Sequence, residues 1–386
     1  MTKTQGNVLL CVTGSLAAVE SVKLARELAR RGFRVRCIAS DNALEIVGRK
    51  ALSFVSEYID LPNHVELAGL RGDCDVVLIA PATATTIARI ASGMGDTAVS
   101  LVALTAIGSG KKVIVAPAMH LGMFQNPAVQ ENVEKLKKLG VEVVWPRIEE
   151  GKAKLASIEE ICLYVERAVS SKEFSGKKVV VTSGPTYEFI DPIRFISNRS
   201  SGRMGLELAL EFWRRGAKVV HVTSKPANLK LDNFREVKVT SVSDMLRHCL
   251  REVRDCCGLF VSAAAPSDFL VRKEDRKIKT CKELTLRLEE APKIIKEVRK
   301  VYDGHVIGFK AETGVSGEEL ERIAVEKMRD DGLEMVVAND VIERGMGTED
   351  TRVLMVAGDR REWAEGNKRD VARKIVEFYV DVCDLD

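Results

Sequence analysis

The chain has 386 residues, 46% of them hydrophobic and 30% charged, and its formal net charge is +3. This length favours two domains with sizeable cores, and the balanced charge indicates neither nucleic acid nor an anionic membrane as a main partner. No apolar run is long enough to span a bilayer and the first residues lack the apolar stretch of a signal peptide, so we expect a cytoplasmic protein.

Strand-like apolar runs alternate with helical segments through the first half of the chain. The first run, residues 8–12, leads through a small, flexible segment at 13–18 into a helix predicted over 19–31. Gly32 follows that helix and suits a helix C-cap. Further strands are predicted at 35–39, 75–80, 112–116 and 141–145, and a helix at 157–169 closes this half.

The second half repeats this alternation after a polar stretch at 170–177, where we place the domain boundary. Its predicted strands are 178–183, 218–224, 236–240, 258–264, 305–311, 333–338 and 353–357. Near-continuous Val, Ile and Leu runs are typical of parallel strands covered on both faces. The sequence therefore predicts an α/β protein with two doubly wound, Rossmann-like domains, 1–172 and 173–386, whose ligands gather at the carboxyl ends of the strands.

The nine cysteines are scattered without a Cys-x-x-Cys pair, and the five histidines show no metal-ligand spacing. This pattern favours neither a disulfide framework nor a zinc site. Cys11 and Cys37 lie in apolar runs and are expected in the core.

Each half carries a polar connection between a strand and a helix that could hold an anionic ligand. In the first half it is segment 13–18, and in the second it is the longer insert 191–205 before a helix predicted over 206–215. Free N–H groups and the helix dipole favour negative charge at such a place, although a surface loop that caps a helix is the simpler alternative. Donor side chains of the longer insert are Arg194, Asn198, Arg199, Ser200, Ser201 and Arg203. Neither segment is a Walker loop or a GxGxxG fingerprint, so a nicotinamide-dependent dehydrogenase is a weak interpretation.

Short motifs in both halves follow the order and spacing of one family, which the chain resembles over nearly its whole length. In the first half they are 14–18, 64–67, 80–83 and 117–119, and in the second 191–205, 263–269, 277–279, 308–313 and 338–340. The family is that of the bifunctional coenzyme A biosynthesis proteins, in which phosphopantothenoylcysteine decarboxylase is fused to phosphopantothenate–cysteine ligase. The resemblance implies a flavodoxin-like, FMN-binding first domain and a nucleotide-binding ligase domain, the second being the more specific match.

The resemblance implies that the second half activates the carboxylate of 4′-phosphopantothenate with a nucleotide, by default CTP with Mg²⁺. The amine of cysteine then attacks the resulting acyl-cytidylate. In this chemistry Lys277 offsets charge at the reacting phosphoryl group, and Asn198 holds the acyl carbonyl. The other implied contacts are Ala264, Asp268, Phe309 and Lys327 for the nucleotide and Arg203 for the substrate. From the residues alone, Lys277 lies in a charged, solvated run and Asp268 is equally a helix N-cap.

For the first half, the resemblance implies FMN-dependent decarboxylation of 4′-phosphopantothenoylcysteine to 4′-phosphopantetheine. The implied FMN contacts are Gly14, Ser15, Ser40 and Thr83. His64 aligns with the catalytic histidine, and an imidazole suits proton transfer near neutral pH. Met119 and His120 are the implied substrate-binding residues.

Two departures from the family pattern concern this first half. His120 replaces an asparagine that binds the substrate carboxylate, and histidine can still donate a hydrogen bond. Segment 146–155 corresponds to a mobile flap whose cysteine protonates an enethiol intermediate, but it contains no cysteine. Cys162 follows in a helical pattern and is expected to be buried, so Lys152, Lys154 or water is the expected donor. Both departures suggest an archaeal-type branch of the family or, alternatively, a first half with impaired reduction.

The main hypothesis is thus a bifunctional enzyme acting on 4′-phosphopantothenate, cysteine and CTP. The alternative keeps an active ligase and makes the flavin half a non-catalytic, FMN-binding scaffold or regulatory domain. By analogy with the family, trimeric flavin domains and dimeric ligase domains would give a homo-oligomer. Base selection depends on pocket shape, so the sequence leaves CTP and ATP open as nucleotides.

Overall fold

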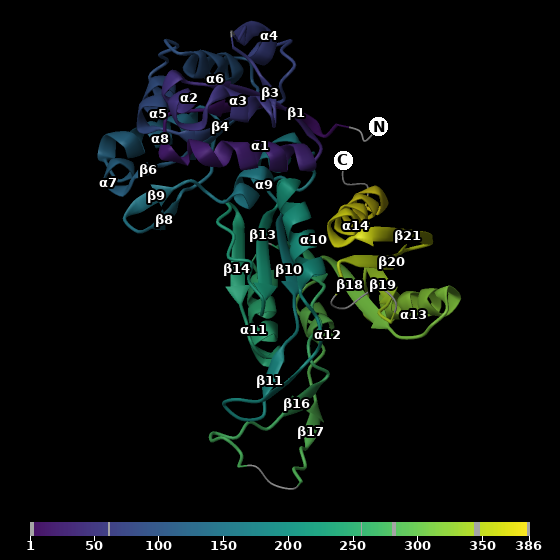
Figure 1. The fold of residues 1–386 in the computed structure, drawn as a ribbon. Helices are drawn as coiled ribbons and strands as arrows, with labels where there is room; N and C mark the ends of the chain where they lie inside the picture. Colours follow the sequence, from purple (N-terminus) through teal and green to yellow (C-terminus); the bar gives the residue numbers. More distant parts are fainter. Residues whose placement is uncertain (1–3, 61, 256, 280–282, 343–347, 384–386) are drawn as a thin grey trace. The chain divides into compact units, whose positions relative to one another are not determined.

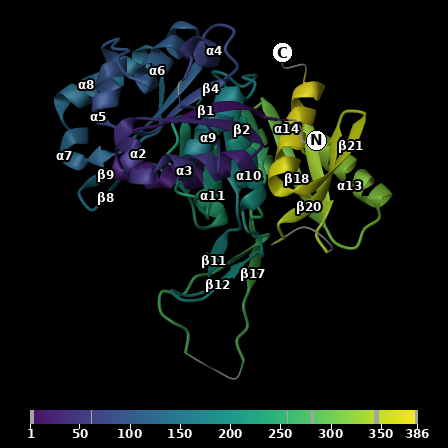
Figure 2. The same ribbon diagram turned by 45° about the horizontal axis from the view of Figure 1, so that its top comes forward.

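The computed structural model describes residues 4–60, 62–255, 257–279, 283–342 and 348–383. The chain folds into two compact units, Met1–Ser170 and Ser171–Asp386 (Figures 1 and 2). Each unit is an α/β structure around one large sheet, which confirms the fold class predicted from the sequence.

The large sheet of the first unit has six parallel strands in the order β3-β2-β1-β4-β5-β7. The strands are β1 (Gly6–Val12), β2 (Phe33–Ala39), β3 (Glu57–Tyr58), β4 (Val76–Ala82), β5 (Lys112–Pro117) and β7 (Glu142–Val143). A small antiparallel sheet is formed by β6 (Met119–His120), β9 (Lys152–Lys154) and β8 (Arg147–Glu149). The helices are η1 (Leu16–Glu20), α1 (Ser21–Arg30), α2 (Asp41–Val47), α3 (Arg49–Ser53), α4 (His64–Ala68), α5 (Ala84–Ala91), α6 (Ala98–Gly108), α7 (Leu121–Phe124), α8 (Pro127–Lys138) and α9 (Ile158–Val169).

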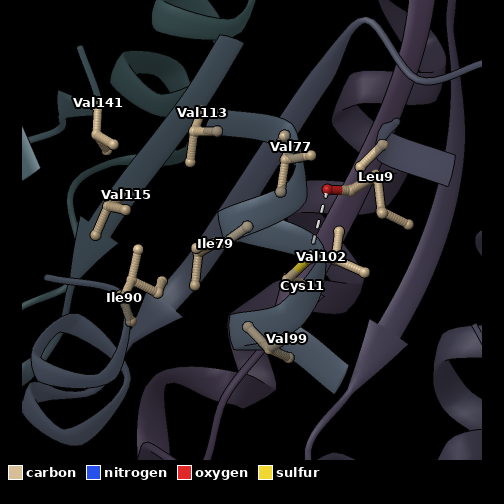
Figure 3. Close-up of a cluster of buried hydrophobic side chains, with 14 of the residues drawn as sticks. Leu9, Cys11, Val77, Ile79, Ile90, Val99, Val102, Val113, Val115 and Val141 are labelled. Atoms are coloured by element: carbon tan, nitrogen blue, oxygen red, sulfur yellow. Dashed lines mark hydrogen bonds between the residues drawn. The ribbon is translucent and has the colours of Figure 1, made fainter. Parts of the chain in front are cut away.

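The core of the first unit forms where α4, α5, α6 and α8 cover one face of the sheet. Alternate residues of β1, β4 and β5, among them Leu9, Val77 and Val115, meet Val99 and Val102 of α6 there (Figure 3). Full burial of such a side chain stabilises the fold by about 1.5–3 kcal/mol. The predicted burial of the strand cysteines is confirmed, because Cys11 and Cys37 are both 0% exposed.

The sheet of the second unit has eight strands in the order β14-β13-β10-β15-β18-β19-β20-β21. The strands are β10 (Lys178–Ser183), β13 (Lys218–Thr223), β14 (Phe234–Lys238), β15 (Cys257–Ser262), β18 (His305–Glu312), β19 (Met335–Asp340), β20 (Asp350–Ala357) and β21 (Arg360–Asn367). Two antiparallel pairs are β11 (Tyr187–Phe189) with β12 (Phe195–Ser197), and β16 (Phe269–Val271) with β17 (Leu288–Glu290). The helices are α10 (Arg203–Arg214), α11 (Val242–Val253), α12 (Ile294–Arg299), α13 (Gly317–Asp330) and α14 (Lys368–Val382).

Helices cover both faces of this second sheet. Helices α11, α12 and α13 share one apolar cluster with the sheet, while α10 and α14 pack against each other and contact β10, β13, β20 and β21. Numbered by chain order, the first six strands run 3-2-1-4-5-6, the order of a Rossmann sheet. Its crevice is expected where β10 and β15, the strands at which the order reverses, end side by side.

The structure corrects several predicted elements. The strand expected at 141–145 is only β7, and the strand expected at 236–240 begins two residues earlier as β14. The expected loop 191–205 contains β12, and strand β20 pairs antiparallel with both β19 and β21. Strand β21 was missed because it is a charged edge strand in which Ala364 is the buried residue, so it has no apolar run.

Candidate active sites

The residues predicted to contact FMN lie at the carboxyl ends of adjacent strands of the first unit. Ser15 caps η1 after β1, Ser40 caps α2 after β2, and Thr83 caps α5 after β4. Each side-chain oxygen accepts a helix N–H, at 3.4, 3.4 and 3.3 Å respectively. Because β2, β1 and β4 are neighbours in the sheet, the fold brings the three hydroxyl groups to one edge.

Gly14 explains how the loop after β1 packs so closely on the next connection. A Cβ at this position would lie 2.5 Å from the Cβ of Asn42, at the start of α2. Thr13 fixes the other side of the loop, since its Oγ1 donates to the carbonyl of Pro81 at 2.7 Å and accepts the N–H of Thr83 at 3.1 Å. The loop is therefore a fixed backbone cradle that has no space for a side chain at Gly14.

A cavity of about 770 Å³ opens beside this edge. Its lining residues are Ser15, Leu16, Ala17, Val19, Glu20, Ala118, Met119, His120, Arg147, Lys152, Ala153, Lys154, Leu155, Ser157 and Ile158. The structure thus brings Ser15, Met119 and His120 together with the segment of β8 and β9. Among the residues that the structure describes, Gly14, Ser40, Thr83 and His64 are outside this lining.

His120 is oriented by its own helix start. It caps α7, and its Nδ1 accepts the N–H of Gly122 at 3.2 Å. A neutral imidazole that accepts at Nδ1 carries its proton at Nε2. His120 can therefore present an N–H donor to an anion in the cavity, as the asparagine amide of the family pattern would.

The Nδ1 atom of His64 contacts a hydroxyl group, whereas that of His120 contacts a backbone N–H. His64 begins α4, and its Nδ1 lies 2.9 Å from Oγ1 of Thr105 on α6. The Thr105 hydroxyl lies 2.9 Å from the carbonyl of Leu101, to which it can donate, and this bond favours the tautomer in which the imidazole donates its Nδ1–H to Thr105. The neutral ring then carries an unprotonated Nε2, which is the form that a general base requires.

The segment expected to be a flap is a hairpin of β8 and β9 with its turn at Glu150 and Gly151. Lys154 Nζ lies 2.8 Å from Glu150 Oε2 and 3.3 Å from Glu149 Oε2. The hydrogen bond to Glu150 raises the pKa of Lys154, which makes it a weaker acid. Cys162 is 0% exposed on α9, as predicted.

The second unit has a cavity of about 500 Å³ at the carboxyl ends of β15, β18 and β19. It is lined by Asn198, Arg199, Ser200, Ser201, Gly202, Arg203, Met204, Gly205, Ala263, Ala264, Ala265, Pro266, Asp268, Phe309, Ala311, Asn339, Val341, Thr351, Val353 and Lys368. The fold therefore gathers Asn198, Arg203, Ala264, Asp268 and Phe309, which are far apart in the sequence, around one space.

The start of α10 reaches this cavity because Gly205 lies directly against β10. A Cβ there would be 2.4 Å from the Cβ of Ser183 and 2.9 Å from the carbonyl oxygen of Thr182. The preceding hydroxyls stabilise the turn: Ser200 Oγ accepts the N–H of Gly202 at 3.2 Å, and Ser201 Oγ accepts the N–H of Arg203 at 3.4 Å.

Asn198 connects the two loops on either side of the crevice. Its Nδ2 donates to the carbonyls of Ala265, at 3.1 Å, and Pro266, at 2.9 Å. Both amide hydrogens are used, so Oδ1 is left as an acceptor. To hold an acyl carbonyl, as predicted, Asn198 must exchange one of these two hydrogen bonds. Asp268, in the same loop as Ala265 and Pro266, forms an ion pair with Lys293 at 2.7 Å and precedes β16, so it is no helix N-cap.

Lys277 and Lys327 are not among the described residues that line this cavity. Lys327 Nζ forms an ion pair with Asp331 at 2.7 Å on α13. Lys277 is exposed in a segment that attaches to the hairpin of β11 and β12, where the N–H of Glu274 donates to the carbonyl of Ile190 at 2.8 Å. Neither lysine is therefore in the lining that Asn198, Asp268 and Phe309 share.

Arg194, another predicted donor, is used within the hairpin. Its guanidinium bonds the buried carboxylate of Asp191 through Nε at 2.9 Å, and its Nη2 donates to the carbonyl of Ile278 at 2.8 Å. Asp191 also accepts the N–H groups of Ile193 and Arg194. The bond from Arg194 is the main cause that holds the pKa of Asp191 well below its usual range.

Some cavity residues carried no assignment from the sequence. Asn339 belongs to a family motif, but Thr351 and Lys368 lie in no motif that we singled out. In the first unit, Thr105 was missed because its role depends on the contact between α4 and α6. The described residues contain no group of three or more His, Cys, Asp or Glu side chains arranged to hold a metal ion. No helix within the described ranges is long and apolar enough to cross a membrane.

Comparison with known families matches each unit separately. Residues 1–170 match the model of the Flavoprotein family. Residues 174–382 match the DNA/pantothenate metabolism flavoprotein C-terminal domain. The two matches together cover nearly all of the chain.

Comparison with whole proteins gives relatives of the same length. The coenzyme A biosynthesis bifunctional protein CoaBC of Thermococcus kodakarensis is 44% identical over 381 residues, which cover 95% of this chain and 93% of the relative. CoaBC of Methanocaldococcus jannaschii is 35% identical over 376 residues, covering 96% and 92%. A solved structure of the C-terminal domain of a CoaBC is 30% identical and covers 56% of this chain and 100% of that domain, with a TM-score of 0.46.

Proposed function

The chain belongs to the family of bifunctional CoaBC proteins of coenzyme A biosynthesis, and from this membership we infer how its two units divide the chemistry. The protein is a phosphopantothenate–cysteine ligase and a phosphopantothenoylcysteine decarboxylase in one chain. The observation that carries this conclusion is the 44% identity over 95% of the chain, with a separate family match in each unit. We assign the decarboxylase to 1–172 and the ligase to 173–386.

The proposed ligase reaction takes place in the cavity of the second unit. The carboxylate of 4′-phosphopantothenate attacks the α-phosphorus of CTP, and pyrophosphate leaves. The amine of cysteine then attacks the acyl carbon, and CMP leaves. Magnesium would enter with the nucleotide, bound to its phosphates.

Several groups of this cavity support the ligase assignment. The loop after β12 and the start of α10 supply backbone N–H groups and Arg203 for an anion, and Phe309 offers an aromatic surface for the base. Asn198 lies where it can change partners from a backbone carbonyl to the intermediate. The proposed role of Lys277 requires its segment to approach the cavity on substrate binding, and that of Lys327 requires it to leave Asp331.

The residues of the first unit fit FMN. The cradle at Gly14 and the hydroxyl groups of Ser15, Ser40 and Thr83 suit a phosphate, and Leu16, Ala17 and Val19 give the adjacent cavity an apolar wall. When bound, FMN would supply the two-electron chemistry of the decarboxylation. We propose that the chain contributes a donor at His120 Nε2 for the substrate carboxylate and a base at His64 Nε2.

The histidine arrangement favours the decarboxylase over the rival scaffold. A non-catalytic FMN-binding unit would have no need to hold one imidazole as a donor and the other as a base. The scaffold alternative is supported by the absence of the flap cysteine. However, Lys152 of the β8–β9 hairpin lines the same cavity as His120. We therefore propose that the flap retains a proton donor.

We also propose a homo-oligomer. The paired strands β11 with β12 and β16 with β17 extend from the second sheet (Figures 1 and 2). Apolar side chains stay exposed on these strands and their turn, including Ile193 at 61%, Phe195 at 48% and Phe269 at 52%. Clusters of exposed apolar residues mark association surfaces, and a second copy of the chain is the partner that fits the family.

The direct test is turnover of 4′-phosphopantothenate and cysteine with Mg²⁺ and either CTP or ATP, with the products identified by mass. We expect CMP and pyrophosphate with CTP, a slower reaction with ATP, and 4′-phosphopantetheine with carbon dioxide once FMN is bound. Absence of any amide product with either nucleotide would contradict the ligase assignment. Amide product without carbon dioxide would support the scaffold alternative.

A further inference from the structure

Lys368 is a buried cation in the ligase cavity, from a part of the chain remote from every motif residue. It is the first residue of α14 and is 5% exposed. Its side chain lines the same cavity as the start of α10. Its Nζ donates to the carbonyl of Thr348 at 2.6 Å, and its own N–H donates to the carbonyl of Glu349 at 3.2 Å.

Three features make this an unfavourable place for a lysine. Burial disfavours the charged form and lowers the pKa of Lys368, and the nearby charge of Arg203 lowers it further. The amino end of a helix favours anions, so a cation in the first position of α14 opposes the helix dipole. An anion bound beside Lys368 would offset all three effects.

The charges around the cavity have the sign that such an anion requires. The charged side chains of its lining are Arg199, Arg203, Lys368 and Asp268. The single carboxylate among these described residues, Asp268, is already paired with Lys293 at 2.7 Å. Arg203 on α10 forms an ion pair at 3.3 Å with Glu349, whose side chain is 87% exposed and outside the described lining. Among the described lining residues, the part near Arg203 and Lys368 therefore carries two cations and no carboxylate.

We propose that Lys368, together with Arg203, binds a phosphate group of a ligase substrate. The inference rests on the proposed ligase function of this cavity. Two substrates carry such a group, the nucleotide and 4′-phosphopantothenate, whereas cysteine does not. Lys368 is thus a substrate-binding residue supplied by α14, which packs directly on α10.

The test compares Lys368→Gln, Lys368→Arg and Lys374→Gln in the full-length protein. Lys374 lies on the same helix and outside the cavity lining, so it is the matched control. Loss of a hydrogen bond between charged groups predicts a rise of about tenfold or more in KM for CTP or for 4′-phosphopantothenate in Lys368→Gln. The substrate whose KM rises identifies the phosphate. The KM for cysteine should not change, and Lys368→Arg should restore most of the affinity.

Unchanged KM values for both phosphorylated substrates in Lys368→Gln would overturn the proposal. Equal impairment of Lys368→Gln and Lys368→Arg, with a raised KM for cysteine, would do the same, because it indicates a structural role. Should Lys368→Gln fail to fold, the wild-type protein is treated with an amine-specific reagent with and without inorganic pyrophosphate. Slower modification of Lys368, but not of Lys374, supports the site, and equal rates overturn it. If the wild-type protein shows no ligase turnover but pyrophosphate still protects Lys368, the proposed ligase function is refuted and the anion site is retained.

Discussion

At the scale of single residues, the hydrogen-bond partners of a histidine decide which chemistry it can perform. His64 gives its Nδ1 proton to Thr105, whereas His120 accepts a backbone N–H at the same atom. These contacts favour opposite tautomers of the two rings, one with a base and one with a donor at Nε2. This assignment follows from the neighbours of each ring and not from its sequence motif.

Thr105→Val tests this assignment, because valine keeps the shape of threonine and removes the hydroxyl. We expect kcat for decarboxylation to fall by about tenfold, as His64 loses the partner that fixes its tautomer. Thr105→Ser should stay near the wild-type rate, and ligation should be unaffected in both variants. Carbon dioxide release from 4′-phosphopantothenoylcysteine is the measurement, and a wild-type rate for Thr105→Val would contradict the role of Thr105.

The sequence predicted part of each site at this scale. Asp268 and Phe309 meet around one cavity because they follow or lie on parallel strands, whose carboxyl ends share an edge, and Asn198 is held there by its hydrogen bonds to the loop after β15. Lys368 could not be found in this way, since the charged run around it looks like a solvated helix start. Lys277 was placed by resemblance alone, and whether it acts in the cavity remains a proposal.

At the scale of elements, we propose that the hairpin of β8 and β9 protonates the decarboxylated intermediate. Both Lys152 and Lys154 line the cavity with His120. The raised pKa of Lys154, which follows from its bond to Glu150, makes that lysine the poorer proton donor. We therefore predict that Lys152 is the donor.

Replacing Lys152 and Lys154 by Met, one at a time and together, shows which of them is the proton donor. We expect Lys152→Met to accumulate the enethiol product, whereas Lys154→Met should still release 4′-phosphopantetheine. Mass analysis of the decarboxylated product is the measurement. If both single variants and the double variant form 4′-phosphopantetheine at the wild-type rate, water or His120 is the donor and the prediction is wrong.

A second element, the segment that carries Lys277, depends on one buried carboxylate. Asp191 Oδ2 accepts the N–H of Ile278 at 3.2 Å as well as the guanidinium of Arg194. Asp191→Asn would turn an N–H₂ group toward these donors and release the segment. We expect faster hydrogen exchange of peptide 272–279 and weaker ligation in this variant, and no change in Asp275→Asn, which alters an exposed carboxylate of the same run.

The pH dependence of this attachment follows from the lowered pKa of Asp191. A carboxyl whose pKa is lower in the folded state stabilises the fold above its ordinary value, about 3.9, and loses this effect only as the pH falls through the lowered value. Protection of peptide 272–279 in the wild type, corrected for intrinsic exchange, should thus be equal at pH 7 and pH 3, where a carboxyl of ordinary pKa is about 90% protonated. Loss of protection at pH 3 would show that the carboxyl titrates normally.

Elements with continuous apolar runs were predictable, and elements without them were not. Strand β10 matches the prediction residue for residue, because Val179, Val180 and Val181 are buried on both faces of the sheet. The hairpin of β11 and β12 and strand β21 were missed, since the first two strands are only three residues long and the third has no apolar run. Their pairing depends on partners elsewhere in the chain and has no local signal.

At the scale of the whole molecule, two sheets whose first six strands have the same order carry two different cavities. Each first strand lies inside its sheet, so each unit has a crevice where the order reverses. The units differ in the connections after these strands, which are hydroxyl caps and a hairpin in the first unit and a glycine-containing loop with cations in the second. The division of the chemistry between the units is therefore the central claim.

The measurement that tests this claim most directly is turnover by the His64→Asn variant. The full-length variant receives 4′-phosphopantothenate, cysteine, CTP, Mg²⁺ and FMN, and its products are identified by mass beside those of the wild type. We predict that the variant ligates at the wild-type rate and stops at 4′-phosphopantothenoylcysteine, with FMN still bound, whereas the wild type proceeds to 4′-phosphopantetheine. Release of carbon dioxide by His64→Asn at the wild-type rate, or loss of ligation in that variant, would contradict the account.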